Sequence, residues 1–284
     1  MPACAITSEG FTTDAILLRR IAYGDHDLIV TFLAPDRGKF TSIAKSARKS
    51  VKRFSGLLEP FTGLQVVCTA GRGKLLILKE AVLRRSPGSI RSNILKTAYA
   101  AYWTELVEGW LEEGPGQPQT ALFHLLGWVL DALEKEASNA SQLSVLFQMR
   151  LLALSGFSPN LCRCACCRAE VDRMPGVNIG FDLARGGLVC ARCGVDTVGR
   201  RIILSKGTAK QLHWLETMPF ARAGCVRFTA QSLAEGLHFL ETCVPYHLGK
   251  QPRSLAFLKQ VRPDASCKTR KTNGQGGTPI CPTT

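Results

Sequence analysis

Six of the twelve cysteines lie in two short clusters, and these clusters strongly constrain how the segment between them folds. The first reads CRCACC from position 162, and the second reads CARC from position 190. In Cys164-x2-Cys167 and Cys190-x2-Cys193 the spacing lets both sulfurs of a turn reach one ion, and the 22 residues between the pairs are close to the gap of a zinc ribbon. Four thiolates form a closed Zn²⁺ site, which is structural because no position is left for water. The sequence therefore predicts a four-cysteine zinc knuckle.

Two further cysteines leave the choice of ligands open at this point. Cys162 can replace Cys164 through a longer loop, and Cys166 lies inside the first pair. A chain with six free or buried cysteines and no metal is the simplest alternative. A redox protein built on Cys164, Cys166 and Cys167 is another, and a zinc content near one ion per chain argues against both.

A basic segment between Asp36 and Glu59 is the second informative feature, because it holds seven cations and no acidic residue. Phe40 and Phe54 are interleaved with the charges, and both are candidates to stack a base. Dense positive charge with aromatic residues suits a surface that binds a phosphate backbone. A solvated loop that only confers solubility is the alternative. The predicted DNA-binding residues are Arg37, Lys39, Lys45, Arg48, Lys49, Lys52 and Arg53.

Five short segments rich in Ile, Leu, Val or Phe surround this basic segment and are typical of strands. They are Asp14–Ile21, Asp27–Leu33, Lys39–Lys45, Gly63–Thr69 and Lys74–Val82. Glycine-containing turns separate most of them, and only the third connection, residues 46–62, is long. Five strands with one long link after the third indicate an OB-fold barrel, whose faces bind oligonucleotides. An SH3-like barrel is the competing fold.

Helical periodicity replaces the strand pattern after Ser86-Pro87-Gly88. The predicted helices are Ile94–Leu111, Gln119–Ala137, Ser141–Leu154, Ser205–Thr217, Thr229–Cys243 and Ser254–Val261. We therefore predict an α+β protein in which an OB-fold nucleic-acid-binding domain (1–84) precedes an α-helical domain (85–262). The helical domain carries the zinc-binding insertion at about 160–200, and residues 263–284 form a disordered tail.

The charge and the missing motifs narrow the class of function. A formal net charge of +14 favours polyanions, with nucleic acid ahead of acidic lipid or peptide. No apolar run approaches the roughly 20 residues of a membrane span, and the N-terminus does not resemble a signal peptide. We therefore expect a cytoplasmic protein with reduced cysteines. Motifs for zinc proteases, deaminases and P-loop nucleotide binding are missing, which predicts a binding protein and not an enzyme.

Several motifs resemble the bacterial recombination mediator family RecO over about residues 8 to 262. Around the long link these are Asp36-Arg-Gly-Lys39, Ala44-Lys45-Ser-Ala-Arg48 and Leu58-Glu-Pro60-Phe61. Around the cysteines and near the end they are Gly156-Phe-Ser-Pro159-Asn-Leu161, Gly186-Gly187-x2-Cys190-x2-Cys193 and Tyr246-x-Leu248-Gly249-x4-Ser254. Ser46 and Arg168 stand where the family usually has Gly, and Cys162 and Cys166 are not typical of it.

The resemblance implies recombinational DNA repair in the bacterial cytoplasm, close to the nucleoid. RecO-like proteins bind single- and double-stranded DNA and anneal complementary strands. With RecR, and in some pathways RecF, they help RecA load onto DNA coated by the single-stranded-DNA-binding protein SSB, whose acidic C-terminal tail contacts their helical part. Candidate cations for that tail are Arg222, Arg227, Lys250 and Arg253. A zinc-ribbon RNA-binding or transcription-associated factor is the rival interpretation, which a competition between DNA and RNA would separate.

Overall fold

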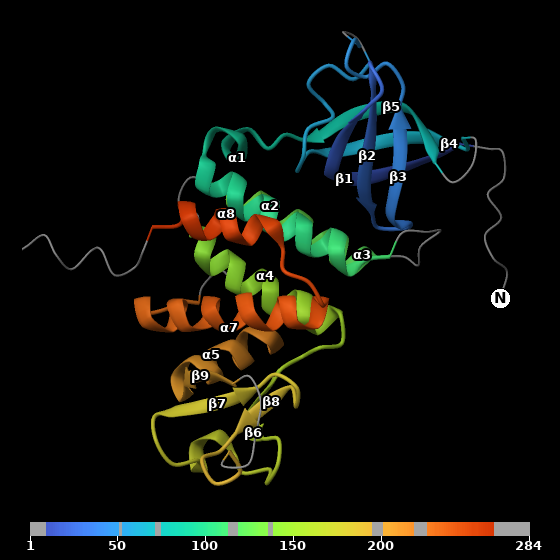
Figure 1. The fold of residues 1–284 in the computed structure, drawn as a ribbon. Coiled ribbons are helices and arrows are strands. Elements are labelled where there is room, and N and C mark those ends of the chain that lie inside the picture. The colour runs from blue at the N-terminus through green and yellow to red at the C-terminus, as the bar shows by residue number, and fades with distance from the viewer. Residues whose placement is uncertain are drawn as a thin grey trace, which may run out of the picture.

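The computed structural model describes residues 10–50, 53–71, 75–112, 119–135, 139–194, 201–218 and 226–263. A five-stranded barrel lies at one end of this part of the chain, and a small sheet that carries the cysteines lies at the other (Figure 1). The helices are packed between these two ends. The predicted α+β class, with a barrel followed by helices, is confirmed.

Five strands form the barrel: β1 (Phe11–Tyr23), β2 (Asp27–Ala34), β3 (Gly38–Ala44), β4 (Gly63–Thr69) and β5 (Leu76–Arg85). They close in the order β1-β2-β3-β5-β4, with only the β3–β5 pair parallel. The long link between β3 and β4 lets the chain cross to the far side of the barrel before β4 begins. This is the strand order of an OB-type barrel, so the prediction from the link after the third strand is correct.

Side-chain alternation fills the barrel interior with apolar groups. Val30, Phe32 and Ala44 are fully buried inside the barrel. Phe54 and Leu58, from the long link, join the same core at 3% and 2% exposure. The link is therefore part of the barrel fold and not a solvated loop along its whole length.

The described part of the chain contains seven α-helices of 5 to 19 residues, which pack around a second core. They are α1 (Gly88–Ser92), α2 (Ile94–Trp110), α3 (Thr120–Glu134), α4 (Ala140–Leu154), α5 (Lys206–Thr217), α7 (Ala230–Leu248) and α8 (Arg253–Val261). Short polar side chains set where several helices begin: Asn93, Asn139, Ser205 and Thr229 each accept a backbone N–H of the following turn. The short α1 lies outside the predicted helices.

Two carboxylates hold the last helix, α8, against the rest of the helical domain. Glu105 on α2 accepts the backbone N–H groups of Arg253 and Ser254 at 2.9 and 2.8 Å. Glu241 on α7, with a side chain 3% exposed, pairs with Arg262 just after α8. The chain therefore stays packed up to the end of the described residues. Ala137, where the second predicted helix ends, and the predicted tail from 264 onward lie outside the described residues.

The cysteine-bearing sheet contains strands that were not predicted individually. Its strands are β6 (Asn160–Cys164), β7 (Asn178–Asp182), β8 (Gly187–Val189) and β9 (Arg201–Ser205), in the order β6-β8-β7-β9. A 3₁₀ turn, Val171–Arg173, lies between β6 and β7. Strands of three to five residues give too little alternation for a sequence pattern to identify them.

Two non-glycine residues adopt left-handed backbone conformations at positions where the resembling family usually has Gly. Ser46 has φ of 54° at the start of the long link, and Arg168 has φ of 62° after the first cysteine pair. Such a conformation brings Cβ close to the following carbonyl in any residue except glycine. Both departures from the family pattern therefore carry backbone strain.

Replacing Ser46 by Gly should stabilise the barrel by about 1 kcal/mol, because the left-handed strain is removed and no side-chain hydrogen bond is lost. The measurement is the free energy of unfolding in urea. Ser50→Gly is the matched control in the same link: the Ser50 hydroxyl accepts the N–H groups of Arg53 and Phe54 at 3.0 and 3.2 Å, so this variant should be less stable. Equal destabilisation of both variants would contradict the strain at Ser46.

Candidate nucleic-acid interface and cysteine cluster

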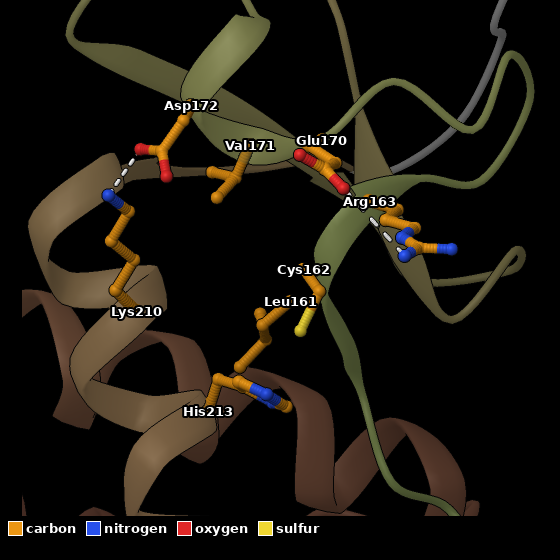
Figure 2. A pocket seen from close by; sticks show the side chains of 8 residues that line it. All are labelled: Leu161, Cys162, Arg163, Glu170, Val171, Asp172, Lys210 and His213. Atoms are coloured by element: carbon orange, nitrogen blue, oxygen red, sulfur yellow. Dashed lines mark ion pairs between the residues drawn. The ribbon is translucent and has the colours of Figure 1, made fainter.

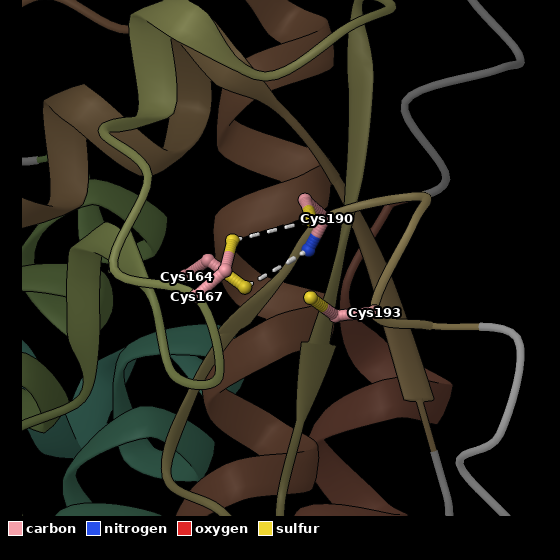
Figure 3. A group of neighbouring side chains, drawn as sticks. All are labelled: Cys164, Cys167, Cys190 and Cys193. Atoms are coloured by element: carbon pink, nitrogen blue, oxygen red, sulfur yellow. Dashed lines mark hydrogen bonds between the residues drawn. The ribbon is translucent and has the colours of Figure 1, made fainter.

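The structure brings the four predicted metal ligands together. The Sγ atoms of Cys164, Cys167, Cys190 and Cys193 all lie within 4.8 Å of one another, and those of Cys167 and Cys190 are 3.7 Å apart (Figure 3). They meet because β6, which ends at Cys164, pairs in parallel with β8, which Cys190 follows. Among the described residues this is the one such cluster, and Cys162 is not part of it.

The electrostatics of the cluster also suit a cation. Burial raises the pKa of the Cys164 thiol, but backbone N–H donors, including that of Cys190 at 3.4 Å, outweigh it and lower the pKa to about 6. The sulfurs of Cys190 and Cys167 raise the pKa of Cys193 to about 12. Four sulfurs this close cannot all be ionised without a cation between them. The donor set and the closed geometry fit a structural metal ion.

The basic segment is divided by the fold. Lys45, Arg48, Lys49 and Arg53 are all exposed, and they lie where β3 passes into the long link. Arg48 fastens this part of the link to the β1–β2 turn, because its backbone N–H donates to the carbonyl of His26 at 3.0 Å. Its guanidinium also donates to the carbonyl of Asp25 at 3.2 Å. These four cations form the basic rim of the barrel, and Lys52 lies outside the described residues.

The other two predicted cations lie at the opposite end of β3. Lys39 is 8% exposed, and its ammonium donates to the backbone carbonyl of Glu108 on α2 at 2.9 Å. This arrangement favours a role in joining the barrel to the helices. Arg37 lies over the ring of Phe11, 3.7 Å from its centroid. The structure therefore does not bring all the predicted DNA-binding residues onto one surface.

The prediction that Phe40 or Phe54 stacks a base is wrong. Phe40 is 7% exposed and packs against Phe32, with the ring centroids 5.4 Å apart. Strand alternation places Phe40 on the same side of β3 as the buried Ser42 and Ala44, which is the interior of the barrel. Phe54 belongs to the same interior core. Aromatic spacing within a basic segment did not reveal which face each ring occupies.

An outward-facing row of apolar side chains offers the contact surface for bases that the two buried phenylalanines do not offer. Ile21 pairs with Ile29, Ile29 with Ile43, and Ile43 with Ile77, so one row crosses β1, β2, β3 and β5. Ile21 is 45% exposed and the other three are partly buried. Tyr23, 54% exposed, lies two residues beyond Ile21 on the same face. The alternation of each strand contained this signal, which sequence reasoning missed.

The row and the basic rim lie side by side. Lys45 directly follows β3 two residues beyond Ile43, and Tyr23 pairs with Asp27 on the strand between them. The Asp27 carboxylate already accepts the backbone N–H of Ser46 at 2.7 Å. An apolar strip with one exposed aromatic ring and a border of cations can hold bases on the strip and phosphates on the border.

A hollow of about 280 Å³ lies between the cysteine-bearing sheet and α5 (Figure 2). Its cations face carboxylates: Arg163 is 3.8 Å from Glu170, and Lys210 pairs with Asp172. Cys162 and His213 also line it. Because these cations are paired, the hollow offers less to an anionic ligand than the rim of the barrel does.

Comparison with protein families identifies the relationship. The family model for the N-terminal part of recombination protein O matches residues 9–87, and the model for its C-terminal part matches residues 91–256. This chain belongs to the RecO family. The two RecO matches together cover the barrel, the cysteine cluster and most of the helical part, so the resemblance found in the sequence motifs is confirmed.

Individual relatives agree with the RecO family match. DNA repair protein RecO of Desulfosudis oleivorans is 43% identical over 258 residues, which are 89% of this chain and 98% of the relative. DNA repair protein RecO of Desulfatibacillum aliphaticivorans is 43% identical over 254 residues (88% and 97%). That of Syntrophus aciditrophicus is 32% identical over 253 residues (88% and 95%). None of the described helices is both long and apolar enough to span a membrane.

Proposed function

We propose that this RecO-family chain is a recombination mediator that binds single- and double-stranded DNA and anneals complementary single strands. In this role it acts with RecR, and in some pathways with RecF, to promote RecA loading onto SSB-coated DNA in the bacterial cytoplasm. It works as a binding protein and not as an enzyme. The observation that carries the proposal is the outer face of the barrel, where the isoleucine row and Tyr23 adjoin the basic rim.

The geometry suggests how this face promotes annealing. Lys45, Arg48, Lys49 and Arg53 neutralise phosphates along one strand and release its counterions. Bases rest on the isoleucine row and on Tyr23 without sequence preference, because every base has an apolar face. Screening of one polyanion lowers its repulsion for the complementary strand. Lys39 and Arg37 take no part in this surface.

Replacing the four rim cations by Ala should weaken single-strand binding and reduce its salt dependence. If each makes one phosphate contact, the slope of log K against log salt becomes shallower by about 0.7 per contact. Titration of a labelled oligonucleotide at several salt concentrations measures the slope. An unchanged slope in a folded variant would show that the rim does not contact the phosphates of DNA.

Tyr23→Ala is the matched comparison on the same face. It should lower affinity while leaving the salt slope unchanged, because stacking on an aromatic ring contributes about 1–3 kcal/mol per base and involves no phosphate. Arg37→Ala, at the other end of β3, should change neither quantity.

We propose that the metal at the cysteine cluster is Zn²⁺, held by Cys164, Cys167, Cys190 and Cys193. Purified protein should contain about one zinc ion per chain, and Cys190→Ser should lose it and unfold the cysteine-bearing sheet. Metal analysis together with thiol titration measures this. Cys162→Ser, which removes a cysteine outside the cluster, should retain zinc; loss of zinc in that variant would contradict the ligand assignment.

The helical domain offers a surface for the acidic, apolar tail of SSB. Phe157 and Tyr246 are 44% and 48% exposed, and His247 lies between them, 4.7 Å from Phe157 and 5.3 Å from Tyr246 by ring centroids. Trp110 at the end of α2 adjoins Phe157 at 5.8 Å. Lys250, two residues after α7, is exposed, and its side chain lies beside Gly109 on α2, the residue before Trp110. We propose that this aromatic patch and Lys250 receive the tail.

The other cations considered for the tail are placed differently. Arg253 begins α8, three residues after Lys250, and is exposed. Arg227 contacts a different helix, because its backbone carbonyl accepts a hydrogen bond from Gln211 on α5. Arg222 lies outside the described residues. Of the three described candidates, Lys250 and Arg253 are three positions apart at the junction of α7 and α8, so these two are proposed to act together at the patch.

Annealing of complementary strands that are each precoated with SSB tests the mediator role. We expect the chain to accelerate annealing, and the acceleration to fade as salt rises, because the contacts are electrostatic. SSB without its C-terminal tail should weaken the effect, as should Lys250→Ala. If free strands bind normally but coated strands do not anneal faster, the mediator role fails and RNA becomes the ligand to examine.

A further inference from the structure

Three exposed arginines surround the cysteine cluster, at the end of the molecule opposite the barrel (Figure 1). Arg168 directly follows Cys167, and Arg192 directly precedes Cys193. The guanidinium of Arg185 contacts the sulfur of Cys166. Because the ligand sulfurs lie within 4.8 Å of one another, the two turns that carry Arg168 and Arg192 are neighbours. We call Arg168, Arg185 and Arg192 the knuckle arginines.

Arg168 and Arg192 are less neutralised than the other cations nearby. Arg163 and Lys210 each face a carboxylate in the hollow beside α5. In the described part of the chain, by contrast, neither Arg168 nor Arg192 has a carboxylate oxygen within 4.0 Å. Arg185 has Asp182 at 3.8 Å, but that carboxylate side chain is only 5% exposed. Two exposed guanidinium groups at neighbouring turns therefore remain available to a ligand.

The backbone of Arg168 supports a functional reading of this position. Its φ of 62° lies in the left-handed region, which destabilises a non-glycine residue by about 1–2 kcal/mol. Residues held in such conformations concentrate at sites of function. A long cationic side chain occupies a position where glycine would be unstrained, so the side chain itself is the candidate reason.

We propose that the knuckle arginines form a second binding site for the phosphate backbone of nucleic acid. The guanidinium fork matches the geometry of phosphate oxygens and stays charged at all relevant pH values. The site rests on the proposed function, because it binds the same class of ligand as the barrel. The packed helices separate the two surfaces, so one chain holds two strands, or two distant parts of one strand.

A purely structural role of the same arginines, in stabilising the metal cluster, would give a different result. A zinc ion with four thiolates carries net negative charge, and nearby arginines can stabilise it. In that case removal of the three arginines would reduce zinc retention, and the folded variant would bind nucleic acid as the wild type does. The proposal predicts the opposite pattern.

The test compares three variants of the full chain in their binding of a labelled ten-nucleotide single strand. The knuckle variant is Arg168→Gly, Arg185→Gln and Arg192→Gln; the barrel variant replaces the four rim cations by Ala. Arg163→Gln is the control, because it removes an exposed arginine of the same sheet that is paired with Glu170. Zinc content and thermal unfolding are measured for each. Arg168→Gly also relieves the strained backbone, so the knuckle variant is expected to fold.

We expect the wild type and Arg163→Gln to bind two oligonucleotides per chain, and the knuckle and barrel variants to bind one each, all with unchanged zinc content. Loss of one site should make the slope of log K against log salt shallower by about 0.7 for each phosphate contact that is removed. An unchanged stoichiometry in the knuckle variant overturns the second site but leaves the barrel intact. Failure of the wild type to bind any strand defeats the proposed function itself. Binding of poly-glutamate is measured for the same variants. If the knuckle variant still binds two oligonucleotides but has lost the poly-glutamate binding of the wild type, the knuckle arginines bind an acidic peptide and the proposal is overturned.

Discussion

The joint between the barrel and the helices depends on cations that converge on the end of α2. The ammonium of Lys39 is buried and donates to the carbonyl of Glu108, and the guanidinium of Arg19 pairs with the carboxylate of the same residue at 2.8 Å. Carbonyls in the last turn of a helix lack intrahelical partners and carry partial negative charge, so they favour cations. The hydrogen bond to the Glu108 carbonyl offsets the cost of burying the Lys39 ammonium. It also fixes the orientation of β3 relative to the helical core.

The same joint determines which part of the barrel remains available to a ligand. Ile16, Leu18 and Leu33, near the α2 end of the barrel, enter the helical core. Arg85 at the end of β5 donates to the carbonyl of Gly127 on α3 at 2.9 Å and extends this contact. The outer face farther along β1, from Ile21 to Tyr23, is not covered by any of the helices that the structure describes. An apolar row beside a basic rim remains exposed because the helices cover only one end of the barrel.

Local signals determine most elements of this fold, and the sequence reveals them. The caps at Ser205 and Thr229 stand at the start of two predicted helices, and the spacing of the cysteine pairs selects four candidate ligands that the structure brings together. What the sequence does not reveal depends on long-range contacts. Nothing local distinguishes Lys39, which is buried against α2, from Lys45, which is exposed, and the two stand only six positions apart. The base-stacking role of Phe54 failed for the same reason, because the link folds back into the barrel.

The two proposed binding surfaces lie far apart, and this separation has a consequence for the proposed annealing. Several helices, each about 10 Å across, lie between the barrel and the cysteine cluster. Since the Debye length is about 8–10 Å at physiological salt, a strand bound at one surface scarcely repels a strand bound at the other. Both sites can therefore fill together, but two short strands held so far apart cannot pair on one chain. The arrangement favours long strands, whose free segments meet at a raised local concentration while their anchored parts stay bound.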